Sequence, residues 1–141
     1  MELKNLNNFN PSTCISGKIT GLNRIVAGIF RKYVSPFGVS NSQLTLLFIL
    51  TKMDGLNQKQ LSEMIYLEKS TLNRNLKRLF DQELLSKQNF PSISITEKGK
   101  RLVNDIIPEW RKAMDEIESI MGDSGKMALD TLVQNITQKQ N

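Results

Sequence analysis

The stretch KSTLNRNLKRLF, residues 69–80, decides the fold of this chain. Its apolar residues recur at intervals of three and four, the spacing that brings side chains onto one face of an α-helix. These apolar residues are Leu72, Leu76, Leu79 and Phe80. A rotation of about 100° per residue places a polar set on the opposite face, namely Ser70, Arg74, Lys77 and Arg78. The stretch therefore predicts a helix with one side facing a core and one side of hydrogen-bond donors.

The donor side of this helix carries no acidic residue between positions 69 and 78. Solvated helix faces, the alternative interpretation, commonly mix Glu with Lys, so the pattern favours a partner that bears phosphates. Small residues at the start of the helix let its backbone approach base edges, and the cations further along can neutralise phosphates. Together with one lysine of the hairpin described next, the candidate residues for contact with double-stranded DNA are Lys69, Ser70, Thr71, Asn73, Arg74, Asn75, Lys77, Arg78 and Lys87.

A short helix precedes the donor-faced helix, and a hairpin follows it. Asn57 has the position of an N-cap for a helix that ends near Ile65, with a tight turn at Tyr66-Leu67. Beyond residue 84 the apolar period changes from helical to alternating, which predicts strands at 85–88 and 92–96. This order of elements is that of a winged helix-turn-helix, in which the second helix enters the major groove of DNA.

Two long apolar stripes flank this unit, one at 13–33 and one at 102–121. Between the first stripe and the winged unit, Ser40 and Gln43 have the capping-box spacing ahead of a buried helix at 44–51. In the second stripe Pro108 removes a backbone donor, and we expect a kink there. Gly122 then separates a last helix, at 124–137, whose apolar side is available to a partner.

These elements predict a mainly α fold with a small β-hairpin wing, in a single domain over residues 1–141. We expect the winged helix-turn-helix at 40–101 and dimerisation helices at 13–34 and 102–141. The Asn-rich residues 1–12 are expected to form a loosely held arm.

The composition disfavours most enzymes. Among 141 residues, 39% are hydrophobic, no histidine occurs and there is one cysteine, so the commonest metal ligand and general base are missing. We therefore predict no catalytic residues, no metal site and no cofactor. Residues 1–101 carry fifteen basic and seven acidic side chains, whereas residues 102–141 carry four and seven. The basic surplus thus lies in the part that contains the predicted DNA-binding unit.

No membrane or export segment is expected. The longest apolar run, 44–50, has seven residues, including Thr45, and a spanning helix needs about 20. The start of the chain lacks the apolar stretch of a signal peptide, and a lone cysteine suits a reducing compartment, so we expect a cytoplasmic protein.

Four motifs resemble, in order and spacing, those of the MarR family of bacterial transcriptional regulators. They are Ser42-Gln43-Leu44, the stretch NQKQLSE at 57–63, the stretch KSTLNRNLKRL at 69–79, and Ile95-Thr96-Glu97-Lys98-Gly99-Lys100. The flanks are also similar to one branch of the family, with Cys14 at the start of the first helix and Pro108-Glu109-Trp110 in the long C-terminal helix. The resemblance covers nearly the whole chain.

This resemblance implies a homodimer with intertwined terminal helices and a repressor that binds a pseudo-palindromic operator and is released by a small ligand or an oxidant. The chain departs from the family in the wing, where an arginine of the family enters the minor groove. Between Leu85 and Ile93 this chain offers only Lys87, Gln88 and Asn89. Its wing therefore contacts the minor groove weakly, or Lys87 takes over that contact.

Two alternatives stay open at this point. Some members of the family switch through a cysteine of the first helix, so Cys14 is a candidate redox site, and its place near a helix N-terminus would favour a thiolate. A small residue at a helix start is the simpler interpretation, because no second cysteine is present to resolve a sulfenic acid. From another class, the chain could be a helical protein-interaction module that keeps the winged-helix fold with weak or lost DNA binding. Aromatic residues at helical spacing could line an effector cleft, but core packing is their commoner role; these are Phe30, Tyr33, Phe48 and Trp110.

Overall fold

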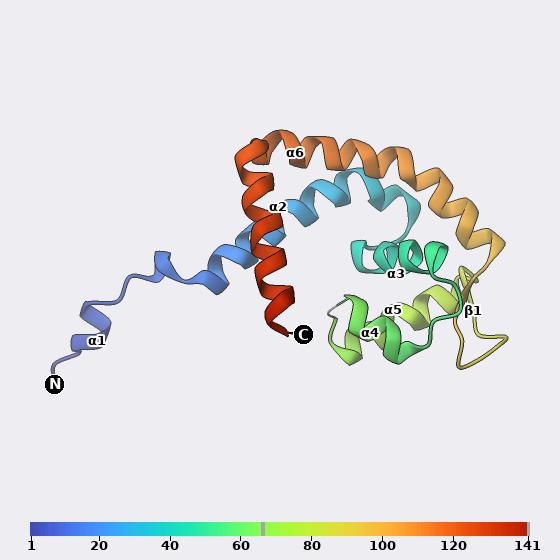
Figure 1. Cartoon of the computed structure of the whole chain (residues 1–141), viewed down its shortest axis with the longest axis horizontal. Helices are drawn as coiled ribbons and strands as arrows, with labels where there is room; N and C mark the ends of the chain where they lie inside the picture. The colour runs from blue at the N-terminus through green and yellow to red at the C-terminus, as the bar shows by residue number, and fades with distance from the viewer. Residues whose placement is uncertain (66, 141) are drawn as a thin grey trace.

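The computed structural model describes residues 1–65 and 67–140, so the turn predicted at Tyr66 lies partly outside the described residues. In chain order the elements are α1 (Lys4–Asn7), η1 (Pro11–Thr13), α2 (Ile15–Val34), η2 (Ser35–Phe37), α3 (Asn41–Lys52), α4 (Gln58–Ile65), α5 (Lys69–Asp81), β1 (Leu85–Ser86), β2 (Ser94–Ile95) and α6 (Glu97–Gln140). The helices α3, α4 and α5 gather with the hairpin at one end, while α2 runs beside α6 and α1 projects away (Figure 1). The predicted mainly α fold with a two-stranded wing is confirmed.

Side-chain caps set the starts of the two helices that precede α5. The Ser40 hydroxyl accepts a hydrogen bond from the Gln43 amide at 3.2 Å, and the Gln43 side chain accepts one from the Ser40 amide at 3.1 Å. At the start of α4, Asn57 and Gln60 make the same reciprocal pair, at 2.8 and 2.9 Å. Both predicted caps are confirmed, and each satisfies backbone donors that a helix start otherwise leaves unpaired.

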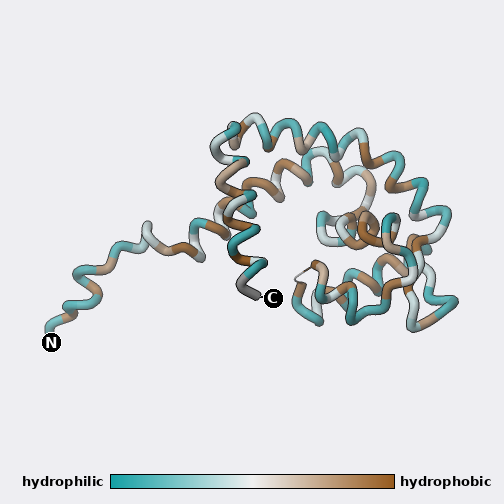
Figure 2. The backbone as a smooth tube through the Cα atoms, in the orientation of Figure 1, coloured by the Kyte–Doolittle hydropathy of each residue, from teal (hydrophilic) through white to brown (hydrophobic). Residues whose placement is uncertain are grey.

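One hydrophobic core joins the winged unit to the start of α6 (Figure 2). Its fully buried large side chains are Val34, Leu46, Leu47, Leu50, Leu61, Leu72, Leu79, Ile93 and Ile106. At its edge the rings of Phe48 and Trp110 meet edge to face with centroids 5.6 Å apart. Tyr33, Phe48 and Trp110 pack against this core, which agrees with core packing as their role.

The hairpin is shorter than predicted because its second strand changes partner. Leu85 and Ser86 pair with Ile95 and Ser94, but Ile93 pairs instead with Leu56 in the loop before α4. The Ile93 amide donates to the Leu56 carbonyl at 2.9 Å, and the Gly55 amide donates to the Ile93 carbonyl at 3.1 Å. The wing is therefore attached to the loop between α3 and α4 as well as to α5.

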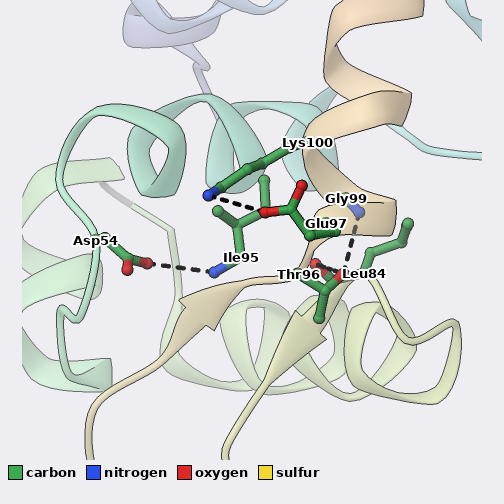
Figure 3. Close-up of polar contacts among 7 residues, drawn as sticks. All are labelled: Asp54, Leu84, Ile95, Thr96, Glu97, Gly99 and Lys100. Atoms are coloured by element: carbon green, nitrogen blue, oxygen red, sulfur yellow. Dashed lines mark hydrogen bonds and ion pairs between the residues drawn. The ribbon is translucent and has the colours of Figure 1, made fainter.

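Threonine and glycine fix the junction between the wing and α6 (Figure 3). The Thr96 hydroxyl donates to the Leu84 carbonyl at 3.1 Å and accepts a hydrogen bond from the Gly99 amide at 3.0 Å, so Thr96 caps α6. In β2, the Ile95 amide donates a hydrogen bond to the Asp54 carboxylate at 3.3 Å. These bonds tie both strands to the elements around them.

The backbone of α6 departs from helical dihedral angles at Gly122 (φ 69°, ψ 172°), where the helix turns sharply (Figure 1). The kink expected at Pro108 stays a prediction, because a proline can bend a helix whose dihedral angles remain helical. Pro108 and Asn104, whose carbonyl loses its helical partner, are both exposed, so water can hydrate that carbonyl. Glycine accommodates the left-handed backbone at position 122 without a steric penalty.

Large apolar side chains remain uncovered along α2 and the last part of α6. They are Ile15, Ile19, Leu22 and Ile25 on α2, and Ile120, Met127, Leu129, Leu132, Val133 and Ile136 on α6.

Within the chain the two helices are joined by an ion pair between Lys32 and Glu116 at 2.6 Å. The hydrogen bond that Lys32 donates to Glu116 raises the pKa of Lys32 above its ordinary value of 10.5. Within the described residues, no helix has the length and apolar character needed to span a bilayer.

Adding a single methyl group at Gly99 is expected to loosen the junction between wing and α6. A Cβ built there would lie 2.4 Å from the Leu84 carbonyl oxygen, a backbone atom that cannot yield easily. We expect Gly99→Ala to lower the free energy of unfolding by about 2 kcal/mol or more, as overpacking does in a core. Chemical denaturation monitored by circular dichroism would measure the change.

The matched control is Gly21→Ala, since Gly21 is also helical and a Cβ there meets nothing within 4 Å. The control is expected to keep or raise stability, because alanine favours a helix by up to about 1 kcal/mol over glycine. Equal stability of the two alanine variants would contradict the proposed close contact at Gly99.

Candidate nucleic-acid interface

The helix α5 presents the predicted polar side to solvent because its leucine side is buried. Leu72 and Leu79 have no exposed surface and Leu76 is 3% exposed. Four predicted residues of the opposite face are exposed, namely Ser70, Arg74, Lys77 and Arg78, as are Lys69 and Asn73 beside them. Thr71 and Asn75 are half-buried at the two edges of this surface. The structure therefore brings eight of the nine candidate residues together on one helix.

The cations of α5 are largely available to a ligand. The Arg74 guanidinium donates to the Thr71 hydroxyl at 3.3 Å, a contact that aligns it along the helix. Lys77 lies 3.8 Å from Asp81, but both side chains are mostly exposed and such a pair contributes little in water. Among the ion pairs of residues 1–65 and 67–140, Lys77 is the one cation of α5 that takes part.

Two asparagines of α5 have partners within the protein. The Gln58 side-chain amide donates to the Asn73 side-chain oxygen, which links α4 to α5. The Asn75 side-chain oxygen accepts from the Gln43 amide at 3.4 Å, which links α3 to α5. Since Gln43 is 4% exposed, this contact lies inside the protein and Asn75 has a structural partner there. Asn73, in contrast, keeps an exposed side chain.

Gln43 helps to position α5, and it was not among the residues predicted from the sequence for this surface. Its side chain bonds both to the Ser40 amide and to Asn75, so one buried group joins the start of α3 to α5. The sequence contained a signal, because Gln43 is a polar residue directly before an almost wholly apolar run. The capping box accounts for the side-chain oxygen of Gln43, which accepts from the Ser40 amide. The contact of its side-chain nitrogen with Asn75 depends on how α3 packs against α5 and could not be predicted from the local sequence.

The ninth candidate, Lys87, lies in the wing and faces α5. Its ammonium lies 5.2 Å from the centre of the Phe80 ring, which is a cation–π distance. Lys87 and Phe90 of the wing line one groove, of about 500 Å³, with side chains of α4 and α5. The side chains from the helices are Gln58, Asn73, Leu76, Lys77, Phe80 and Asp81. Phe90 was absent from the predicted site.

Cys14, the candidate redox residue, lies away from this surface. It is exposed at the N-cap position of α2, and the start of α2 is the end of that helix that lies away from α5 (Figure 1). In the part of the chain that the structure describes, no three or more Cys, Asp or Glu side chains gather as metal ligands would.

The helices α3 to α5 and the hairpin define a winged helix-turn-helix protein. Residues 39–92, which span this unit, match the sequence model of the MarR family. An uncharacterised HTH-type transcriptional regulator of Bacillus subtilis, YdgJ, is 22% identical over 122 residues, 82% of this chain and 73% of the relative.

Solved structures of this family share the fold. BpsR of Bordetella bronchiseptica, described in relation to the regulation of its DNA binding by 6-hydroxynicotinic acid, matches with a TM-score of 0.78 at 14% identity. The match covers 91% of this chain and 97% of BpsR. A MarR family protein of Mycobacterium tuberculosis in complex with DNA matches with a TM-score of 0.67 at 14% identity, over 88% of this chain and 98% of that protein.

Removing the buried amide of Gln43 is expected to destabilise the packing of α3 against α5. Gln43→Leu keeps the approximate size of the side chain but leaves the Ser40 amide and the Asn75 side chain without this partner. We expect the free energy of unfolding to fall by about 1–3 kcal/mol, the usual cost of unpaired buried polar groups. Urea denaturation would measure it, with Gln82→Leu, at an exposed glutamine, as the matched control. A loss no larger than that of the control would show that the amide does not hold the two helices together.

Proposed function

We propose that this protein is a transcriptional regulator that binds double-stranded DNA through α5. The observation that carries the proposal is the exposed, cationic and hydrogen-bonding side of α5 opposite a fully buried leucine side. An α-helix fits the major groove, where side-chain amides and guanidinium groups distinguish base pairs. In this arrangement Ser70, Thr71 and Asn73 face base edges, while Arg74, Lys77 and Arg78 contact bases or phosphates. The match of residues 39–92 to the sequence model of the MarR family supports the same function.

We further propose that the regulator is a homodimer. The uncovered apolar residues of α2 and of α6 beyond Gly122 form long stripes that a single chain leaves in water. A monomer rarely exposes so much contiguous apolar surface, and two copies can cover it by packing these helices against each other. Two copies would also present two α5 helices to two half-sites of a pseudo-palindromic operator. Binding there would block transcription, which makes the protein a repressor.

A small molecule would release the repressor by binding between the dimerisation helices and the winged unit. A cavity of about 360 Å³ lies there, where the end of α2 meets the start of α3. Arg31 and Ser40 are among its lining residues, so it offers a cation and a hydroxyl to a small polar ligand. BpsR, whose DNA binding is regulated by 6-hydroxynicotinic acid, is a relative of similar fold that supports this idea.

Loss of Arg74 is expected to weaken DNA binding without unfolding the protein. Among the residues that the structure describes, the exposed guanidinium has one side-chain hydrogen bond, to Thr71. A single lost base or phosphate contact costs about 1–3 kcal/mol, or roughly 5- to 150-fold in affinity. A duplex selected by the wild-type protein from a random pool would serve as the probe, with fluorescence anisotropy over a range of salt concentrations. The slope of log affinity against log salt is expected to become shallower by about 1 per lost phosphate contact.

Arg111→Ala is the matched control, because Arg111 is exposed on α6 and away from α5. Unchanged affinity of Arg74→Ala would contradict the proposed role of α5. Failure of the wild-type chain to select any duplex would favour the alternative function, a protein-interaction module that keeps the winged-helix fold.

A charge placed in the uncovered stripe of α6 is expected to dissociate the dimer. Leu132, which is 45% exposed in the single chain, would be covered by the second copy, so Leu132→Glu buries a carboxylate against apolar surface. We expect the dimer dissociation constant to rise roughly tenfold or more. Sedimentation velocity would measure it, and Gln134→Glu, which puts the same side chain on the other side of the helix, is the control. Identical dimerisation of the two variants would argue against this interface.

A further inference from the structure

The wing ends in an exposed aromatic side chain that neither the core nor α5 covers. Phe90 is 71% exposed, whereas the other large apolar residues of the hairpin, Leu85, Ile93 and Ile95, are buried. The tip is held by a succession of turns, in which the Phe90 amide donates to the Lys87 carbonyl and the Ser92 amide to the Asn89 carbonyl, both at 3.0 Å. The backbone therefore holds this aromatic ring at a defined place outside the protein.

The tip is continuous with the exposed surface of α5. Phe90 and Lys87 share their groove with Asn73 and Lys77, two residues of the proposed DNA-contacting side of α5. Lys87 is the one cationic residue between Leu85 and Ile93, and it is partly engaged by the Phe80 ring. The tip of the wing thus presents an apolar ring with few charges around it, and Asp81 is the acidic residue of the groove.

We propose that Phe90 is a wedge that enters the minor groove of the duplex whose major groove holds α5. This inference rests on the proposed function and names how the wing takes part in it. A phenyl ring offers no hydrogen bond to base edges, and it recognises DNA by packing against sugars and by pushing between base pairs. Apolar side chains used in this way partly unstack a base step and bend the duplex toward the major groove. The bend favours flexible steps such as TA and CA, so Phe90 contributes specificity through deformability of the DNA.

The position of Lys87 fits this role. A ring that enters the minor groove brings its neighbours close to the two sugar-phosphate backbones that border the groove, which is about 6 Å wide. Lys87, on the strand side of the tip, and Lys77, across the groove of the protein, lie where they can neutralise phosphates on either side of the ring. The wing therefore needs no arginine in the minor groove to contribute to binding.

The experiment compares Phe90→Ala with Phe9→Ala in the full-length chain. Phe9 is the matched control, since it is an exposed phenylalanine (62%) in the arm that precedes α2. The probe is the duplex selected by the wild-type protein, labelled at both ends so that energy transfer reports bending and anisotropy reports affinity. We expect Phe90→Ala to bind roughly tenfold or more weakly, to bend the duplex less, and to lose preference at the base steps beneath the wing.

The salt dependence distinguishes this residue from the cations of α5. Because phenylalanine neutralises no phosphate, Phe90→Ala is expected to keep the wild-type slope of log affinity against log salt, while Arg74→Ala is expected to lower it. Phe90→Trp, which keeps an aromatic wedge, is expected to restore bending. Unchanged affinity and bending in Phe90→Ala would overturn the inference while leaving the regulator function intact. A loss of dimerisation with normal DNA binding would overturn it as well, since Phe90 would then contact a second copy.

A second measurement uses the wild-type protein alone, so it does not depend on how a variant folds. 2-Aminopurine placed in turn at each adenine of the selected duplex brightens when its neighbours unstack. We expect 2-aminopurine to brighten at one base step in each half-site, next to the bases that α5 contacts and on their outer side. Absence of brightening at every position would overturn the wedge, and absence of any selected duplex would overturn the proposed function together with it.

Discussion

The burial of the leucine side of α5 is the constraint on which the remaining structure depends. Leu72, Leu76 and Leu79 lie in the core with the leucines of α3, and this fixes the rotation of α5 about its own axis. Once that rotation is fixed, a helical period of 3.6 residues leaves no choice over which residues point outward. The polar side of α5 is therefore positioned by apolar packing, and the amides of Gln43 and Gln58 then connect α5 to the helices before it.

The wing is held by the start of α6 and by the loop before α4, so its position follows theirs. Leu84 at its start bonds to Thr96, which caps α6, and Gly99 in the first turn of α6 leaves room for the Leu84 carbonyl. Ile93 pairs with Leu56 in the loop before α4. A shift of α6 relative to α3 would thus move the wing tip as well as α5. This gives a physical route by which a ligand between α2 and α3 could alter both DNA-contacting parts together.

Most of the fold could be predicted from local patterns, and the failures have a common origin in tertiary contacts. The period of three and four located α5, and the capping pairs at Ser40 and Asn57 located the helices before it. The hairpin was predicted too long because Ile93 pairs with Leu56, a partner distant in sequence. Within α6 the sharp turn lies at Gly122, the glycine that was predicted to separate the last helix from the stripe before it. The link from Gln43 to Asn75 and the position of Phe90 beside α5 depend on the same long-range packing.

The modest positive charge of one winged unit gives a physical reason for two copies of the chain to bind DNA together, joined through the apolar stripes of α2 and α6. A single α5 offers four exposed cations, Lys69, Arg74, Lys77 and Arg78, and the wing adds Lys87. Counterion release scales with the number of phosphates neutralised, so one unit with so few cations binds DNA weakly at physiological salt. In the proposed homodimer, linking two units makes the second contact intramolecular and multiplies affinity without any new contact to DNA. The acidic surplus of residues 102–141 is compatible with this proposal, because in such a dimer those residues would join the two copies and need not approach the phosphates.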